Sequence, residues 1–271
     1  MILAQITDTH IKPAGRLAYR RVDTSAYLAR AVQHLLALDP KPDVVLATGD
    51  LVDAGLPEEY QRLRTLLAPL TMPVHVIPGN HDDREALRAA FADHAYLPRQ
   101  GFLHYVVEQW PLRLIALDTM VPRKIGGLMC AERLAWLDER LAEAPDRPTL
   151  ICMHHPPFAT GIELMDGFGL DNAEAMREVV QRHPQVESVV CGHLHRPIQA
   201  RWAGTIASTA PSTGHQVALD LREQGALEWV MEPPACLLHV WRPGLGVVSH
   251  TSYIGDYGGP QPFFENCRLI E

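Results

Sequence analysis

The sequence predicts an α/β fold of layered sheets and helices. Short apolar runs alternate along the chain with segments of helical period, which is the pattern of that class. The 271 residues are 47% hydrophobic, enough to bury a large core, and the chain is long for one domain but short for two. We therefore expect one main domain with a smaller appended piece.

The expected strands follow the apolar runs in chain order. They are residues 2–6, 44–48, 74–77, 112–117, 150–153 and 186–191. The helical candidates between them are residues 25–38, 58–67, 84–91, 131–141 and 173–182. The last third changes character, with the β-rich runs "CLLHVW" and "GVVSHTSYI" and the Gly/Pro-rich stretch "GDYGGPQPFF". This part predicts closing strands and an irregular C-terminal extension.

Charge and composition exclude several classes of partner. The formal net charge is −8 and no run of Lys or Arg forms a basic stripe, so nucleic acid is not an expected partner. The N-terminal stretch reaches Asp8 after only a few apolar residues, which is too short for a signal segment or a membrane span. The five cysteines lack CxxC spacing and indicate neither a disulfide framework nor a thiolate zinc site. We expect a cytoplasmic protein with no membrane partner.

Metal-type side chains follow five of the expected strands. Open α/β sheets place their ligand sites at these carboxyl ends. Taken singly, each case could be a turn, a helix N-cap or a rigid loop. Their occurrence together in the same structural position favours a shared site, formed by Asp8 and His10, Asp50, Asn80 and His81, His154 and His155, and His193 and His195.

The motifs containing these residues resemble the calcineurin-like metallophosphoesterase superfamily. They are "ITDTH", "GDLVD", "IPGNHDD", "MHHPP" and "CGHLH", and with "PEEYQ" and a later "GHQ" they resemble bacterial glycerophosphodiesterases and class III cyclic-nucleotide phosphodiesterases. The similarity runs from residue 1 to about residue 217. It implies a four-layer α/β/β/α sandwich with a small C-terminal extension or cap. The phosphoesterase core would span residues 1–217, and residues 218–271 would supply closing strands and a cap or oligomerisation extension.

The resemblance also implies a centre of two metal ions. One ion would be held by Asp8, His10, Asp50 and His195, and the other by Asp50, Asn80, His154 and His193. Asp50 would bridge the two ions, since a carboxylate has two oxygens, and would thereby be catalytic as well as a ligand. This mixture of carboxylate, amide and imidazole suits Mn, Fe, Zn or Co and selects none of them.

Other residues near these ligands have roles implied by the resemblance. His81 matches a histidine that binds no metal, contacts the phosphate and protonates the leaving oxygen. Asn80 and His215, the latter in "STGHQV", would contact substrate as well. Asp82 would either orient His81 or cap the following helix, and His155 would support the ligands without binding a metal.

The implied function is a metal-dependent phosphodiesterase. It would hydrolyse small organic phosphodiesters, either glycerophosphodiesters or 3',5'-cyclic nucleotides, with a metal-bridging hydroxide as nucleophile. A phosphomonoesterase or protein phosphatase could use the same metals, whereas a non-catalytic interaction module would be expected to lose ligands that are all present here. The apolar C-terminal extension, with Phe263 and Phe264, predicts a homo-oligomer of two or more subunits.

Overall fold

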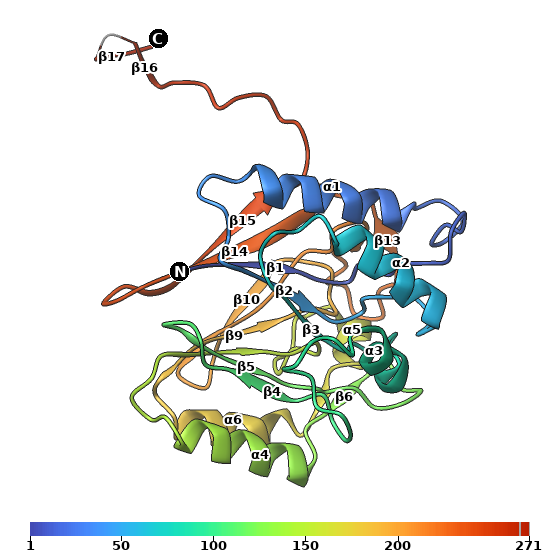
Figure 1. Ribbon diagram of the computed structural model, residues 1–271, viewed down its shortest axis with the longest axis vertical. Coiled ribbons are helices and arrows are strands. Elements are labelled where there is room, and N and C mark those ends of the chain that lie inside the picture. The colour runs from blue at the N-terminus through green and yellow to red at the C-terminus, as the bar shows by residue number, and fades with distance from the viewer. Residues whose placement is uncertain (266, 271) are drawn as a thin grey trace.

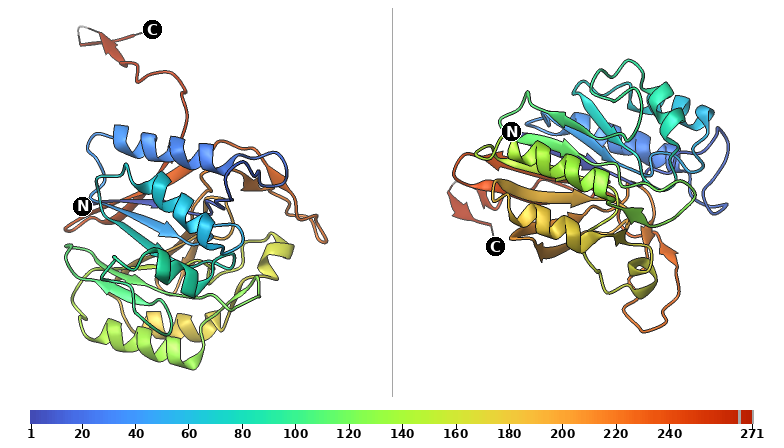
Figure 2. Two further views of the ribbon diagram at one scale, coloured as in Figure 1. Left: turned by 45° about the vertical axis from the view of Figure 1, so that its right-hand side comes forward. Right: turned by 90° about the horizontal axis from the view of Figure 1, so that it is seen from below.

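Two β-sheets pack face to face, and helices cover both outer faces (Figures 1 and 2). The computed structural model describes residues 1–265 and 267–270. Helices α1 and α2 lie over one sheet, and α4 and α6 lie over the other (Figure 1). The order of layers is therefore α/β/β/α, which confirms the predicted four-layer sandwich. Among the described residues, no helix is long and apolar enough to cross a membrane.

The first sheet has five strands in the order β15-β14-β1-β2-β3. Strands β1, β2 and β3 run parallel, while β14 pairs antiparallel with β1 and β15 antiparallel with β14. The closing strands from the last third of the chain thus extend the sheet that the N-terminus begins. The bounds are β1 (Ile2–Ile6), β2 (Val44–Thr48), β3 (Val74–Ile77), β14 (Ala235–Arg242) and β15 (Gly246–Tyr253).

The second sheet has six strands in the order β10-β11-β9-β7-β5-β4. Its four central strands are parallel, and β10 and β4 pair antiparallel at the two edges. The bounds are β4 (Tyr105–Val107), β5 (Arg113–Ala116), β7 (Thr149–Cys152), β9 (Val186–Cys191), β10 (Ile198–Trp202) and β11 (Thr205–Thr209). Strands β4, β10 and β11 were not predicted, because the apolar run of β4 has only three residues and polar residues interrupt those of β10 and β11.

The helices begin and end within one residue of the predicted bounds. They are α1 (Thr24–Ala37), α2 (Pro57–Leu67), α3 (Arg84–Ala90), α4 (Ala131–Ala142) and α6 (Ala173–Gln181), with one short unpredicted turn, α5 (Glu163–Asp166). Local capping explains two of the starts. The Asp23 carboxylate accepts a hydrogen bond from the Ala26 amide before α1, and Asp83 does the same for Ala86 before α3.

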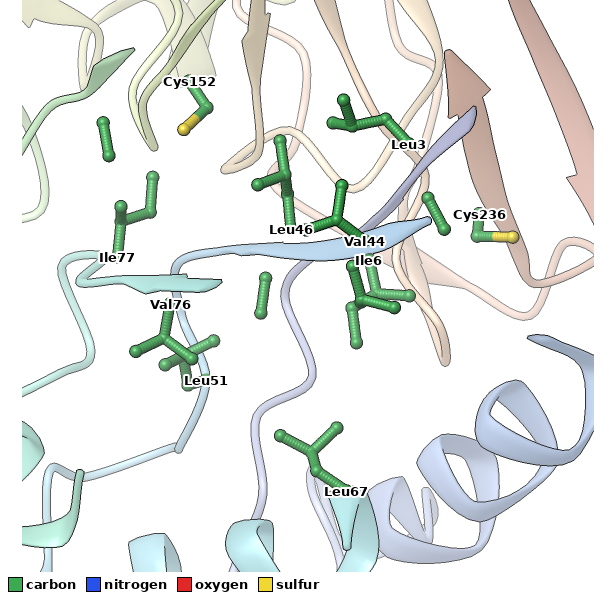
Figure 3. Close-up of a cluster of buried hydrophobic side chains, with 14 of the residues drawn as sticks. Leu3, Ile6, Val44, Leu46, Leu51, Leu67, Val76, Ile77, Cys152 and Cys236 are labelled. Atoms are coloured by element: carbon green, nitrogen blue, oxygen red, sulfur yellow. The ribbon is translucent and has the colours of Figure 1, made fainter. Parts of the chain in front are cut away.

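Alternating side chains divide the core into two layers. Cys152 of β7 points between the sheets toward Leu3 and Leu46 (Figure 3), and Leu150 joins the same cluster. Ile151 and Met153, the intervening residues, join the cluster beneath α4 and α6. Because both faces of β7 are buried, its sequence is a continuous apolar run without polar alternation.

Three short pairs of strands lie outside the main sheets. Strand β6 (Gly127–Leu128) pairs with β8 (Leu170–Asp171), β12 (Gln216–Val217) pairs with β13 (Trp229–Val230), and β16 (Phe264–Glu265) pairs with β17 (Arg268–Leu269). The last pair lies on a C-terminal segment that extends away from the body (Figure 1). Our division of the chain at residue 217 stays a prediction.

A buried glutamine joins the two sheets below the site. The Gln5 amide nitrogen of β1 donates to Thr48 Oγ1 at 2.9 Å and to the Cys191 carbonyl of β9 at 2.9 Å. Its amide oxygen lies 3.0 Å from His239 Nε2, and His239 Nδ1 lies 2.7 Å from Ser249 Oγ. Buried polar groups in such a network are costly to leave without partners.

We predict that Gln5→Leu lowers the free energy of unfolding by about 1–3 kcal/mol, because His239 loses its buried partner. Gln199→Leu on the exposed face of β10 is the matched control and should change stability by less than about 0.5 kcal/mol. Urea unfolding measures the free energy of unfolding of both variants. Equal stability of the two variants would show that the link between the sheets contributes nothing.

Candidate metal centre

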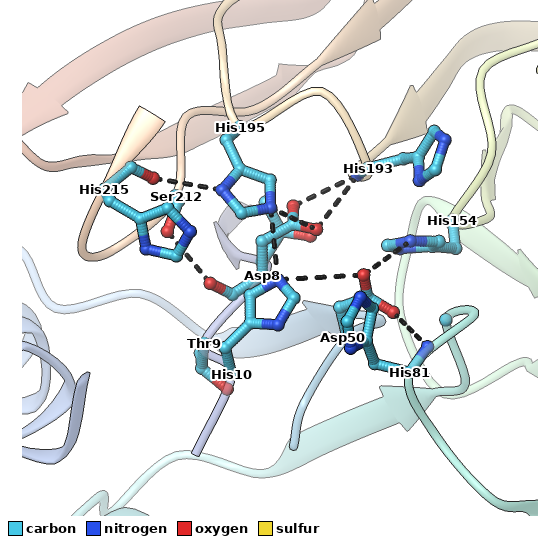
Figure 4. Close-up of polar contacts among 12 residues, drawn as sticks. Asp8, Thr9, His10, Asp50, His81, His154, His193, His195, Ser212 and His215 are labelled. Atoms are coloured by element: carbon cyan, nitrogen blue, oxygen red, sulfur yellow. Dashed lines mark hydrogen bonds and ion pairs between the residues drawn. The ribbon is translucent and has the colours of Figure 1, made fainter. Parts of the chain in front are cut away.

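All the predicted metal ligands converge at the carboxyl ends of five parallel strands. Strands β1, β2 and β3 of the first sheet and β7 and β9 of the second end at the same side of the sandwich. The loops that follow bring the imidazoles and carboxylates together (Figure 4). The predicted ligands thus come from both sheets, and they are Asp8, His10, Asp50, Asn80, His154, His193 and His195.

The first predicted set is compact. His10 Nε2 and His195 Nε2 lie 3.1 Å apart, His195 Nε2 lies 3.4 Å from Asp8 Oδ1, and His10 Nε2 lies 3.7 Å from Asp50 Oδ2. All four residues are buried. Two ring nitrogens and two carboxylate oxygens therefore face a common point.

The second predicted set approaches the same oxygen of Asp50 as the first. His154 Nε2 lies 3.4 Å from Asp50 Oδ2 and 3.2 Å from Asn80 Oδ1. The rings of His154 and His193 are 5.2 Å apart, centroid to centroid, in an edge-on arrangement. Asp50 Oδ2 thus lies near a ring nitrogen of each set, 3.7 Å from His10 Nε2 and 3.4 Å from His154 Nε2.

Backbone carbonyls fix the orientation of three of these imidazoles. His154 Nδ1 donates to the Thr48 carbonyl, His195 Nδ1 to the His215 carbonyl and His193 Nε2 to the Phe168 carbonyl, at 2.9 to 3.1 Å. In a neutral imidazole, the nitrogen that does not donate carries the lone pair. Each ring therefore keeps one nitrogen available as a metal ligand.

The backbone at the site is held in an uncommon conformation. Five of the ligand candidates have φ between 42° and 70°, in the left-handed region, and they are Asp8, His10, Asp50, His193 and His195. Such residues cost on the order of 1–3 kcal/mol each and cluster at functional sites. The surrounding contacts must supply this energy. No sequence motif predicted these left-handed backbone conformations.

Glycines precede the ligands where the loops touch. A Cβ at Gly79 would clash with the backbone and carboxylate of Asp50, and one at Gly192 would clash with Thr7 and the Thr48 carbonyl. These contacts explain the glycine in "GNHDD" and "CGHLH". They also allow the His193 amide to reach the Asp8 carboxylate at 3.1 Å, which links the two sheets.

The electrostatics of the site favour a bound cation. Burial raises the pKa of Asp8, and the Asp50 carboxylate raises it further. Burial and the neighbouring His154 lower the pKa of His193 to about 4, and burial and His10 lower that of His195 to about 3. These two rings are therefore neutral near pH 7, with lone pairs free to bind a metal.

His81 lies at the exposed edge of the cluster. Its amide donates to Asp50 Oδ1 at 2.8 Å, and its Nδ1 lies 2.7 Å from the Asp53 carbonyl. Its ring meets that of His10 edge-on, with centroids 4.6 Å apart. Because Nδ1 donates to a carbonyl, Nε2 is the atom that remains for substrate.

Asp82 has neither of the roles expected for it. The N-cap of α3 is Asp83, and His81 bonds to the Asp53 backbone. Asp82 instead accepts hydrogen bonds from the amides of Gly79 at 2.8 Å and Leu51 at 3.1 Å, and from the Tyr60 hydroxyl at 2.8 Å. It therefore ties together the two loops that carry Asp50 and Asn80, which the sequence alone could not distinguish from a cap.

His155 and His215 differ in what their rings can bind. Both ring nitrogens of His155 have partners, Thr119 Oγ1 at 2.8 Å and the Ile125 carbonyl at 2.9 Å. His215 is buried beside His195, with 4.8 Å between ring centroids, and neither of its ring nitrogens has a protein partner among the described residues. His215 can therefore still bind substrate, whereas His155 can only support its neighbours.

A cavity of about 280 Å³ opens above the cluster. His10, His81 and His215 form part of its lining, together with Asp50 and Asn80. The opposite wall includes Tyr19 and Trp229, which lie in segments far apart in sequence and stack with 5.3 Å between ring centroids. The volume suits a small organic molecule.

Sequence reasoning missed three residues around this cavity. Asp53 Oδ1 lies 3.7 Å from His10 Nδ1 and forms an ion pair with Lys12. Its position three residues after Asp50 was the available signal. Tyr19 and Trp229 carry no motif, because they meet only through the fold.

Two metal ions fit this donor set. The carboxylates of Asp8 and Asp50 are buried and have no Lys or Arg partner among the described residues. The Nε2 atoms of His10 and His195 lie 3.1 Å apart. Both arrangements are unfavourable without positive charge. The clusters Asp8–His10–Asp50 and His10–His195–His215 each bring possible ligand atoms within 4.8 Å of one another. The assignment of particular ligands stays a prediction.

We predict that Asp50→Ala loses both metal ions, because Asp50 is the residue assigned to both. His10→Ala should mainly weaken one site, and His250→Ala, at an exposed position of β15, should retain full occupancy. Elemental analysis after dialysis measures the metal content. Full two-metal occupancy in Asp50→Ala would contradict the bridging assignment.

Residues 1–197 match the family of calcineurin-like phosphoesterases. The chain is 42% identical to a probable glycerophosphodiester phosphodiesterase GpdQ of Arcobacter nitrofigilis, over 100% of both chains. It is 31% identical to the 3',5'-cyclic adenosine monophosphate phosphodiesterase CpdA of Escherichia coli K12, over 78% of this chain and 75% of the relative. In fold it is similar to a dimetal phosphatase from Danio rerio, with a TM-score of 0.66, 15% identity, and 94% and 99% of the two chains covered. With its histidines and aspartates gathered in one cluster, the chain belongs to the calcineurin-like phosphoesterase family.

Proposed function

We propose that the protein is a dinuclear metal-dependent phosphodiesterase acting on small organic phosphodiesters. The observation that carries the proposal is the convergence of two ligand sets on Asp50, beside a cavity of about 280 Å³. The relatives named glycerophosphodiester and cyclic-nucleotide phosphodiesterases support a diester as substrate. The substrate is a glycerophosphodiester or a 3',5'-cyclic nucleotide.

The ligand assignment follows the two geometric sets. Asp8, His10, Asp50 and His195 would hold one ion, and Asp50, Asn80, His154 and His193 the other. The donors suit Mn, Fe, Zn or Co. When bound, the ions supply Lewis acidity that lowers the pKa of water and offsets the negative charge of the phosphoryl group.

The chain's own residues bind the diester and supply a proton to its leaving group. A protonated His81 donates from Nε2 to the departing alkoxide, while its Nδ1 stays bonded to the Asp53 carbonyl. Asn80 and the unpaired ring of His215 lie in the lining, where they can bind phosphate oxygens. Asp82 holds together the two loops that carry Asp50 and Asn80.

The metal-loaded enzyme should hydrolyse diesters faster than the matching monoesters. A suitable panel contains a glycerophosphodiester, a 3',5'-cyclic nucleotide, a dinucleotide and a phosphomonoester, compared by kcat/KM. The cavity is small and its wall is aromatic, so we expect the first two substrates to be preferred. A preference for the monoester would contradict the proposal and favour a phosphomonoesterase.

His81→Ala should slow diesters with poor leaving groups by roughly 10²–10⁴-fold, because glycerol needs a proton as it departs. Diesters that release nitrophenolate need little protonation and should lose much less. The variant should keep both metals, as elemental analysis would show. Equal losses for both substrates would assign His81 to phosphate positioning, and loss of metal would make it a ligand.

We further propose that the protein is a homo-oligomer. Phe263 and Phe264 on the C-terminal segment are 79% and 62% exposed, and that segment extends away from the body (Figure 1). Large apolar side chains on a projecting segment favour packing on a second subunit.

Light scattering at micromolar concentration should give the mass of a dimer or a larger assembly. The double substitution Phe263→Ser with Phe264→Ser should lower that mass without abolishing activity in the metal-loaded enzyme. A monomeric wild type under these conditions would overturn the oligomer proposal.

A further inference from the structure

The motif "PEEYQ" places a buried carboxylate beneath the loop that follows Asp50. Glu59, its third residue, lies in the first turn of α2 and is 1% exposed. Its Oε2 atom accepts hydrogen bonds from the Ala54 amide at 2.9 Å and from the Leu56 amide at 3.1 Å. Among the described residues this carboxylate forms no ion pair. A buried carboxylate without a counter-charge is costly, which points to a role beyond packing.

The cap of α2 explains only one of these two hydrogen bonds. Leu56 is the N-cap, and a glutamate three residues later that accepts from the N-cap amide is the usual capping box. Ala54 lies two residues before the N-cap, outside the helix, so the bond to its amide does not stabilise the helix end. That bond instead fixes a peptide of the loop that carries Asp50.

One peptide unit connects the Glu59 carboxylate to His81. The Ala54 N–H and the Asp53 carbonyl belong to the same planar peptide group and point in opposite directions. The peptide N–H donates to Glu59, and the carbonyl accepts from His81 Nδ1 at 2.7 Å. The side-chain carboxylate of Asp53 is paired with Lys12. The contact with His81 Nδ1 is therefore made by the peptide that Glu59 holds.

Polarisation and close packing both favour a single state of the His81 ring. A peptide whose N–H donates to a carboxylate has a more negative carbonyl oxygen, because hydrogen bonds in a chain polarise one another. The loop also lies tightly against the segment that carries His81, since a Cβ at Gly55 would be 3.0 Å from the Asp83 side chain. The proton is thereby kept on Nδ1, and Nε2 is left to face the cavity.

We propose that Glu59 is a positioning residue that acts on His81 through the Asp53–Ala54 peptide and keeps the proton of the neutral ring on Nδ1. Its kinetic consequence rests on the proposed diesterase function. The proposal deepens that function, because it names the residue that orients the proton donor of the leaving group.

Nitrogen NMR tests the state of the ring without any turnover. In zinc-loaded protein labelled with nitrogen-15 histidine, the signals of His81 are those missing from His81→Ala. At alkaline pH, where imidazoles are neutral, the wild type should carry the proton on Nδ1. Glu59→Ala should shift both ring nitrogens toward a mixture of tautomers, and Glu59→Gln, which keeps an oxygen acceptor without the charge, should shift them less. Glu58→Ala, at the exposed neighbouring position, is the matched control and should leave them unchanged.

Kinetics then show whether the effect is exerted at the leaving group. Glu59→Ala should lower kcat/KM for a diester that releases glycerol by about 10–100-fold, and Glu59→Gln by at least about threefold, with both metals retained by elemental analysis. A diester that releases nitrophenolate should lose less in each variant. In a His81→Ala background, Glu59→Gln should have no further effect, because it acts through the missing ring.

The outcomes separate this proposal from the one on which it rests. Unchanged His81 nitrogen shifts in Glu59→Gln, or an unchanged kcat/KM for the glycerol diester, would overturn the role of Glu59. An equal loss of kcat/KM with and without the His81 ring would overturn it as well and make Glu59 a structural residue. Failure of the metal-loaded wild type to hydrolyse any diester would overturn the diesterase function, while the nitrogen shifts would still decide whether Glu59 positions His81.

Discussion

The burial of two carboxylates between two sheets is the constraint on which the rest of the structure depends. Asp8 and Asp50 follow adjacent strands and are 1% and 2% exposed. Placing an unpaired carboxylate there costs on the order of several kcal/mol. The neighbours that offset this charge are histidines: the Asp50 carboxylate raises the pKa of His154 to about 9, whereas burial keeps His193 and His195 neutral. Buried carboxylates beside neutral imidazoles suit the binding of metal cations, in keeping with the family of calcineurin-like phosphoesterases.

The same constraint accounts for the polar contacts that cross between the sheets. The His193 amide of the second sheet donates to the Asp8 carboxylate of the first, and His154 Nδ1 donates to the Thr48 carbonyl. Gln5 adds a link deeper in the sandwich. These contacts help to hold several ligands in left-handed backbone conformations that are unfavourable in isolation. The apolar core stabilises the fold, and the polar contacts between the sheets hold the predicted metal ligands in place.

Much of this arrangement could be predicted from the sequence. The fully buried parallel strands are continuous apolar runs, so their bounds and the position of His10 or His154 just beyond them were predictable. Strands β10 and β11 were not, because polar residues interrupt them and they form no continuous apolar run. Asp82 could not be assigned, since a carboxylate before a helix most often caps it, whereas here it joins two loops. The stack of Tyr19 on Trp229 depends on a long-range contact that no local pattern encodes.

The lining of the cavity has two chemically different parts. One contains the predicted metal ligands, and the other includes the stacked rings of Tyr19 and Trp229. The shared position of Asp50 is central to this account. Anomalous X-ray diffraction from crystals grown with manganese tests it most directly. Two anomalous peaks, each beside one ligand set and both in contact with the Asp50 carboxylate, are the predicted result. A single peak, or a second peak that Asp50 does not touch, would contradict it.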